Sequence, residues 1–243
     1  MVGNLVLLAL SWLLLRLEGK PLRVLGFDRP LLRLGQFAVG LGIAGAVAAL
    51  QQLGFACANG THWTLNPSVT GPLLLKGLRW NINSVLFEEL IFRGYLLYQA
   101  MRFLGPHRGA LIGAAAFGVY HWFSFGAFGN PVAMAFIFFF TGAFGWMFSV
   151  AFAETRSLAA PVGLHLGWNL VTNFVFSAGP LGATLLVPAN GATRLQAAGL
   201  AGITFGILLP MVLAALVSWF LIRHRLAASE DRTSGRPASD AAF

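Results

Sequence analysis

The sequence predicts an all-α protein, a polytopic bundle of about seven transmembrane helices. The mean hydropathy of +0.74, with 57% hydrophobic and 10% charged residues, lies far outside the range of a soluble domain. Several apolar stretches reach the roughly 20 residues that a helix needs to cross a bilayer. Hydropathy and helix-breaking residues together place the spans near 2–16, 35–57, 76–101, 109–124, 131–153, 160–178 and 199–222.

The two ends of the chain differ in composition. The first segment lacks a basic start, and no small-residue cleavage site precedes Arg16, so we expect a retained helix rather than a signal peptide. Residues 1–226 are predicted to form a single transmembrane domain, with a motif core at about 80–175. Residues 227–243 are rich in Ala, Ser and charged groups, which predicts a disordered cytoplasmic tail.

Basic residues predict the orientation in the membrane. If the loop after the first span is cytoplasmic, twelve Lys and Arg residues lie inside and three lie outside. The N-terminus is then external and the C-terminus cytoplasmic. The composition is rich in Ala, Gly and Arg and poor in Lys, which indicates a bacterium. We therefore expect a multi-pass protein of the plasma (inner) membrane.

Two other classes are excluded by charge and cysteine content. The net charge of +8 comes from basic residues spread along loops, without a basic-aromatic patch, so no nucleic-acid partner is expected. The single cysteine, Cys57, excludes an internal disulfide and a cysteine metal cluster. The expected partners are the lipid bilayer and a membrane-associated substrate.

Two adjacent glutamates lie inside the third predicted span, and they are the only two of the eight acidic residues within any span. An ionised carboxylate in hydrocarbon costs several kcal/mol unless it is compensated, so such acids usually mark function. Glu89 and Arg93 are four residues apart and are predicted to form an ion pair. Glu88 is rotated by about 100° from Glu89 on the helix. A carboxylate without a cation suits a general base, so Glu88 is the predicted base, supported by Glu89 and Arg93. Alternatively, both acids pair with Arg93 and only brace the bundle.

Three further polar residues fall inside predicted spans. His121 lies on the fourth span, and His165 and Asn169 lie four residues apart on one face of the sixth. Counted at about 1.5 Å per residue from the cytoplasmic ends, Glu88 lies about 20 Å deep, His121 about 18 Å and His165 about 12 Å. A lone membrane histidine is often a packing residue, but the overlapping depths predict one shared site.

The available residues restrict the chemistry. No Gly-x-Ser-Gly element, no His-Glu-x-x-His helix and no aspartate lies in a predicted span. Glu88 with His121 can activate water, and His165 with Asn169 can stabilise an oxyanion. Glu88, His121 and His165 can also bind a divalent metal such as zinc, and the residues alone leave both possibilities open.

Three short motifs occur in order on separate hydrophobic segments: Glu88-Glu89-x-x-x-Arg93, Phe117-x-x-x-His121 and His165-x-x-x-Asn169. They resemble the motifs of the CPBP intramembrane proteases, which include type II CAAX prenyl endopeptidases and relatives linked to bacteriocin processing. The resemblance implies a helical bundle around a cytoplasm-facing intramembrane cavity. It also implies metal-independent glutamate protease chemistry without a cofactor, with Glu88 and His121 activating water and His165 and Asn169 forming the oxyanion site.

Two other functions fit the same residues. A non-catalytic protein of the same fold would act as a membrane immunity factor or partner. A proton-coupled transporter would use Glu88, His121 and His165 as a proton relay. The leading hypothesis is an intramembrane endopeptidase, a hydrolase that cleaves a membrane-associated protein or peptide.

Overall fold

In the computed structural model of the chain, the fold is described for residues 1–233 and the side chains for residues 1–224. Most of this part is helical, with one short two-stranded sheet, which confirms the predicted all-α class. The helices are α1 (Val2–Leu17), α2 (Pro30–Ala58), α3 (Gly71–Arg93), α4 (Tyr95–Leu104), α5 (Pro106–Ser124), α6 (Pro131–Thr155), α7 (Ala159–Asn169), α8 (Gly199–Ile203) and α9 (Leu209–Thr233). A 3-10 turn, η1 (Leu22–Leu25), precedes α2, while π-helical segments η2 (Leu170–Val175) and η3 (Thr204–Leu208) follow α7 and α8.

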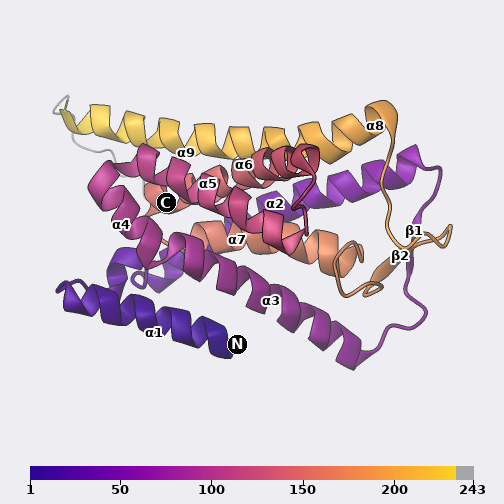
Figure 1. The fold of residues 1–243 in the computed structure, drawn as a ribbon, viewed down its shortest axis with the longest axis horizontal. Helices are drawn as coiled ribbons and strands as arrows, with labels where there is room; N and C mark the ends of the chain where they lie inside the picture. Colours follow the sequence, from indigo (N-terminus) through magenta and orange to yellow (C-terminus); the bar gives the residue numbers. More distant parts are fainter. Residues whose placement is uncertain (234–243) are drawn as a thin grey trace.

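Within the described part of the chain, three helical segments are long and apolar enough to cross a membrane by length and composition. They are Leu22–Ala58, Pro131–Thr155 and Gly199–His224, and they run along the long axis of the molecule (Figure 1). Helix α1 is apolar but shorter. The described residues therefore form a membrane-compatible helical bundle.

The predicted third span, 76–101, is wrong as a single helix. It breaks at Gly94, so that α3 ends at Arg93 and α4 begins at Tyr95. A side chain at Gly94 would place its Cβ 2.2 Å from the Leu90 carbonyl oxygen, so this sharp break requires glycine. Glu88 lies five residues, or about 8 Å, from the end of α3, so its depth cannot be counted along one straight helix to residue 101.

The predicted tail at 227–243 begins within the last turns of α9, which continues to Thr233. Residues 234–243 of that tail lie outside the described residues.

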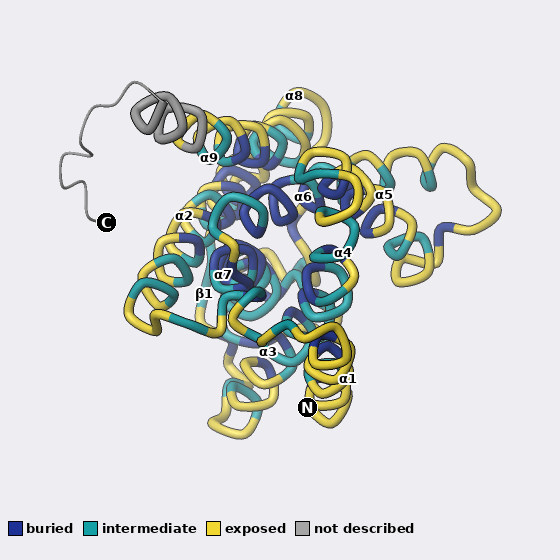
Figure 2. Tube along the Cα trace, turned by 90° about the vertical axis from the view of Figure 1, so that its left-hand side faces the viewer, coloured by how far each residue is buried: buried dark blue, intermediate teal, exposed yellow. Residues whose placement is uncertain are grey.

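Helix α7 lies at the centre of the bundle (Figure 2). It packs closely against α2 because both helices carry glycine along their contact. A Cβ at Gly163 would lie 2.2 Å from the Phe37 carbonyl oxygen, and one at Gly167 would lie 2.3 Å from that of Leu41. Small residues allow the backbones of membrane helices to approach in this way. The close contact fixes the position of the helix that carries His165.

A two-stranded antiparallel sheet joins the two long loops at one end of the molecule, opposite α4 (Figure 1). Strand β1 (Trp63–Leu65) pairs with β2 (Leu186–Pro188), with Thr64 opposite Val187. The side chain of Asn66 adds a hydrogen bond of 2.9 Å to the Thr184 carbonyl oxygen. The sequence did not predict this sheet, since its strands have only three residues each.

Candidate active site

Glu88, His121 and His165 come together from three helices, α3, α5 and α7. Glu88 Oε2 lies 4.0 Å from His121 Nε2 and 3.9 Å from His165 Nε2. The side chains of Glu88 and His121 are 13% and 14% exposed, while that of His165 is 7% exposed. Glu88 Oε2 has no hydrogen-bond partner among the described residues. Two ring nitrogens therefore face one carboxylate oxygen that is free to take another partner.

A backbone carbonyl sets the orientation of the His121 ring. His121 Nδ1 lies 2.8 Å from the Phe117 carbonyl oxygen, one turn earlier on α5. A carbonyl oxygen only accepts hydrogen bonds, so Nδ1 is the donor. In the neutral imidazole, Nε2 then carries the lone pair, and this is the nitrogen that faces Glu88.

Glu89 sets the orientation of the His165 ring through a hydrogen bond to Nδ1. His165 Nδ1 lies 2.8 Å from Glu89 Oε1, and the ring stacks on Phe148 with centroids 4.8 Å apart. An ionised carboxylate accepts, so Nδ1 carries the proton and Nε2 faces Glu88. Sequence reasoning missed this contact because it joins two helices and has no local spacing signal.

Glu89 and Arg93 form a fully buried ion pair. Arg93 Nη1 lies 3.3 Å from Glu89 Oε1, as the four-residue spacing predicts. Arg93 Nη2 donates to the Gly145 carbonyl oxygen at 3.1 Å, and its guanidinium lies 4.4 Å from the centre of the Phe117 ring. One carboxylate thus receives a histidine and an arginine in a site without water access. Burial of such a pair is tolerated because each charge keeps a partner.

Asn169 is not brought into direct contact with the three converging residues. It is the last residue of α7, one turn beyond His165 on the same face, and its side chain has no hydrogen bond within the described part of the chain. Asn173, one turn further on in η2, donates to Asn81 Oδ1 at 3.4 Å. Asn81 is buried and also donates to the Gly77 carbonyl oxygen. These two asparagines join α3 to η2 beside the site.

Glu88, His121 and His165 are also the candidate ligands of a divalent metal. Nδ1 hydrogen bonds to a carbonyl and a carboxylate are the outer contacts that metal-binding histidines usually have. However, the described residues contain no group of three or more His, Cys, Asp or Glu side chains in metal-binding geometry.

The fold and this cluster define a membrane-compatible helical protein with a buried carboxylate–histidine site, a combination suited to activating water. Residues 70–171 match a family model described as Rce1-like, type II CAAX prenyl endopeptidase Rce1-like. The match includes all three motifs, places this region with a protease family and confirms the resemblance to the CPBP proteases. Comparison with curated proteins and with solved structures gives no match.

Proposed function

We propose that the chain is an intramembrane endopeptidase that hydrolyses a peptide bond of a membrane-associated protein or peptide. The observation that carries the proposal is the position of Glu88 Oε2, which faces Nε2 of both histidines at 3.9 and 4.0 Å. These separations are too long for direct hydrogen bonds but suit one water molecule that bonds to both sides. The family match to a protease supports the same reaction class.

In the proposed reaction, Glu88 Oε2 and His121 Nε2 bind the attacking water, and Glu88 takes its proton. The water oxygen attacks the carbonyl carbon of the substrate. Glu88 then returns the proton to the leaving amine as the carbon–nitrogen bond breaks, so that atoms and charges balance. A base positioned in this way typically contributes a factor of about 10² to 10⁴ in rate.

His165 and Asn169 stabilise the oxyanion in this proposal. The Asn169 amide donates directly, whereas His165 Nε2 donates only when the ring carries both protons. Glu89 holds this ring in place, because its carboxylate accepts the hydrogen bond from Nδ1. One donor of this kind is worth about 10²- to 10³-fold in kcat.

The finer features of the membrane arrangement are part of the same proposal. Residues 1–226 form one domain of about seven spans, with the site in a cavity that faces the cytoplasm and with an external N-terminus. The side chains of Glu88 and His121 are partly exposed, although Glu88 Oε2 itself is buried, so the proposed water reaches the base through a narrow opening. The proposed location is the inner membrane of a bacterium, and the reaction uses no metal.

The test compares hydrolysis of a membrane-anchored peptide library by the purified parent protein and by Glu88→Gln, both in lipid vesicles. We expect Glu88→Gln to lose at least about 100-fold in rate with an unchanged thermal midpoint. Glu18→Gln, which removes an acid outside the site, is the control: it is expected to lower the thermal midpoint at pH 7 but to retain the parent rate. Equal cleavage by the parent and by Glu88→Gln would contradict the proposal.

The same preparation separates the remaining alternatives. A chelator leaves the rate unchanged if the reaction is metal-independent, and abolishes it if a metal is required. Protection of cells that survives Glu88→Gln favours the non-catalytic immunity or partner protein. Solute flux into the vesicles that depends on a pH gradient favours the transporter.

A further inference from the structure

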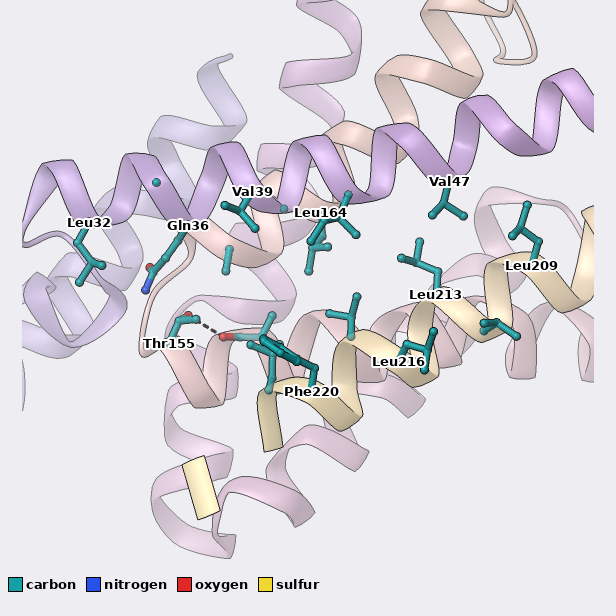
Figure 3. Close-up of a pocket in the computed structure, with 18 of the residues that line it drawn as sticks. Leu32, Gln36, Val39, Val47, Thr155, Leu164, Leu209, Leu213, Leu216 and Phe220 are labelled. Carbon is teal, nitrogen blue, oxygen red and sulfur yellow. Dashed lines mark hydrogen bonds between the residues drawn. The ribbon is translucent and has the colours of Figure 1, made fainter. Parts of the chain in front are cut away.

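A long apolar groove lies between α2 and α9, away from the proposed active site. It has a volume of about 1010 Å³, and α6 and α7 line its floor (Figure 3). Its walls are aliphatic, from Val39 and Val47 on α2 and from Leu213 and Leu216 on α9. Leu164 faces the groove while its neighbour His165 faces Glu88, so α7 separates the two sites.

The groove closes at one end. There, Gln51 Nε2 of α2 donates to the Phe205 carbonyl oxygen at 2.9 Å, and a Cβ at Gly54 would lie 2.4 Å from the Phe205 ring. A helix from another molecule could occupy the groove only if the groove stayed open along its whole length, because packed helices need about 8–10 Å between their axes. A wedge that is closed at one end suits flexible hydrocarbon chains better than a straight helix.

The other end of the groove is polar and basic. Gln36 and Thr155 lie there (Figure 3), and three exposed arginines follow or precede the lining residues by at most two positions in the chain. These arginines are Arg29, Arg156 and Arg223, and none of them has an ion pair with a carboxylate within the described residues.

The nearby acids only partly balance this charge. Asp28 is already paired with Arg33 at 2.6 Å, and Glu154 lies next to Thr155. Within the part of the chain whose side chains are described, four arginines and two carboxylates thus lie close in the sequence to residues that line this end of the groove, which gives it a net positive charge. Basic pockets between transmembrane helices are recognised by anionic lipid headgroups.

We propose that this groove binds an anionic phospholipid. Its acyl chains lie between α2 and α9, and its phosphate lies among Arg29, Arg156 and Arg223. The groove runs along α2 from Leu31 to Val47, which is about 24 Å, and the hydrocarbon core of a bilayer is about 30 Å thick. One leaflet contributes about half of that thickness, so the groove is long enough for the acyl chains of a lipid whose headgroup lies at the basic end.

The charge part of the proposal is tested with purified full-length protein stripped of lipid. Binding of phosphatidylglycerol is compared with binding of phosphatidylcholine with the same acyl chains, by native mass spectrometry and thermal unfolding. We expect the parent protein to prefer phosphatidylglycerol, and R29Q/R156Q/R223Q to lose that preference. A basic residue near an anionic lipid surface contributes about fivefold, so the triple variant loses on the order of 100-fold. The control variant K76Q/R79Q/R194Q changes the same number of charges elsewhere and keeps the preference.

The acyl part is tested with two glycines of α2. Gly35 lines the groove and Gly42 does not, and a Cβ at either position meets no atom within 4 Å. Leucine at Gly35 fills part of the groove without a clash in the protein, so Gly35→Leu is expected to retain less lipid. Gly42→Leu is expected to retain as much as the parent.

Several outcomes would overturn the proposal. The charge part is wrong if R29Q/R156Q/R223Q keeps the preference for phosphatidylglycerol. The acyl part is wrong if Gly35→Leu and Gly42→Leu retain equal amounts of lipid. Both are wrong if inorganic phosphate raises the thermal midpoint as much as phosphatidylglycerol does. A dimer of the chain that Gly35→Leu disperses would assign the groove to a second copy instead. None of these measurements depends on proteolysis, so they remain informative if the proposed function is wrong.

Discussion

His165 and Glu89 are hydrogen-bonded across two helices, with His165 Nδ1 2.8 Å from Glu89 Oε1. The two residues are 76 positions apart in the chain, and Glu89 is also the buried partner of Arg93. Glu89 therefore has two structural roles. It balances the buried charge of Arg93, and it orients the His165 ring that faces Glu88.

Replacement of Glu89 by Gln is expected to affect stability and hydrolysis through different partners. Arg93 would be left as a buried charge without a counterion, which costs about 3–5 kcal/mol of unfolding free energy. His165 would lose the carboxylate that orients its ring, so we also expect a lower cleavage rate. Denaturation and peptide cleavage measured on the same preparation check both effects.

The double variant Glu89→Gln/Arg93→Met separates the two roles. It removes the unbalanced charge, so we expect most of the lost stability to return. Cleavage stays low, because His165 still lacks its carboxylate. If cleavage returns together with stability, Glu89 only braces the bundle, and its role in positioning His165 is wrong.

A second prediction concerns the contact between α1 and α4. Glu18 is exposed, and it accepts hydrogen bonds from Tyr95 and Gln99 and an ion pair from Arg102 at 2.7 Å. These hydrogen bonds, with the charge of Arg102, lower the pKa of Glu18 below its ordinary value. A lowered folded-state pKa adds stability above the ordinary glutamate pKa of about 4.3, and this contribution is lost as the pH falls through the folded-state value.

Glu18→Gln is therefore expected to unfold more easily than the parent protein at pH 7. The difference between the two proteins should shrink below about pH 4 and vanish in stronger acid. Thermal midpoints measured as a function of pH check this. A constant difference at every pH would show that the carboxylate charge does not contribute.

Some of these contacts could be predicted from the sequence and others could not. The pairing of Glu89 with Arg93 follows from their spacing on one helix, and hydropathy alone predicts the all-α class. The bond between Glu89 and His165 depends on how α3 meets α7, which no local pattern encodes.

Two features of the fold were missed for different physical reasons. The break at Gly94 lies between two apolar runs, Leu90–Phe92 and Tyr95–Tyr98, which hydropathy joins into one span because it does not show where the backbone turns. The β1–β2 sheet is set by its pairing partner and by the hydrogen bond from Asn66, since three residues are too few to show an alternating pattern.

A third prediction compares two glycines of the bundle. At Gly163, an added Cβ would lie 2.2 Å from the Phe37 carbonyl oxygen, so Gly163→Ala must push α7 away from α2. We expect a loss of about 1–3 kcal/mol, typical of overpacking. Gly42→Ala meets no atom within 4 Å and is expected to gain up to about 1 kcal/mol from helix propensity. Thermal unfolding in one detergent compares both variants with the parent, and equal behaviour of the two would contradict the close packing of α7.

The final prediction separates two asparagines that lie one turn apart. Asn169 has no side-chain hydrogen bond within the described residues, so Asn169→Ala should leave stability unchanged. As a proposed oxyanion donor, its loss should lower kcat by about 10²- to 10³-fold with little change in KM. Asn173→Ala breaks the 3.4 Å bond to Asn81 and is expected to cost about 1 kcal/mol of stability. Asn173 contacts none of the reacting groups in the proposed mechanism, so its effect on kcat should be smaller than that of Asn169→Ala. The reverse pattern, with kcat intact in Asn169→Ala, would remove Asn169 from the mechanism and leave the oxyanion to His165 alone.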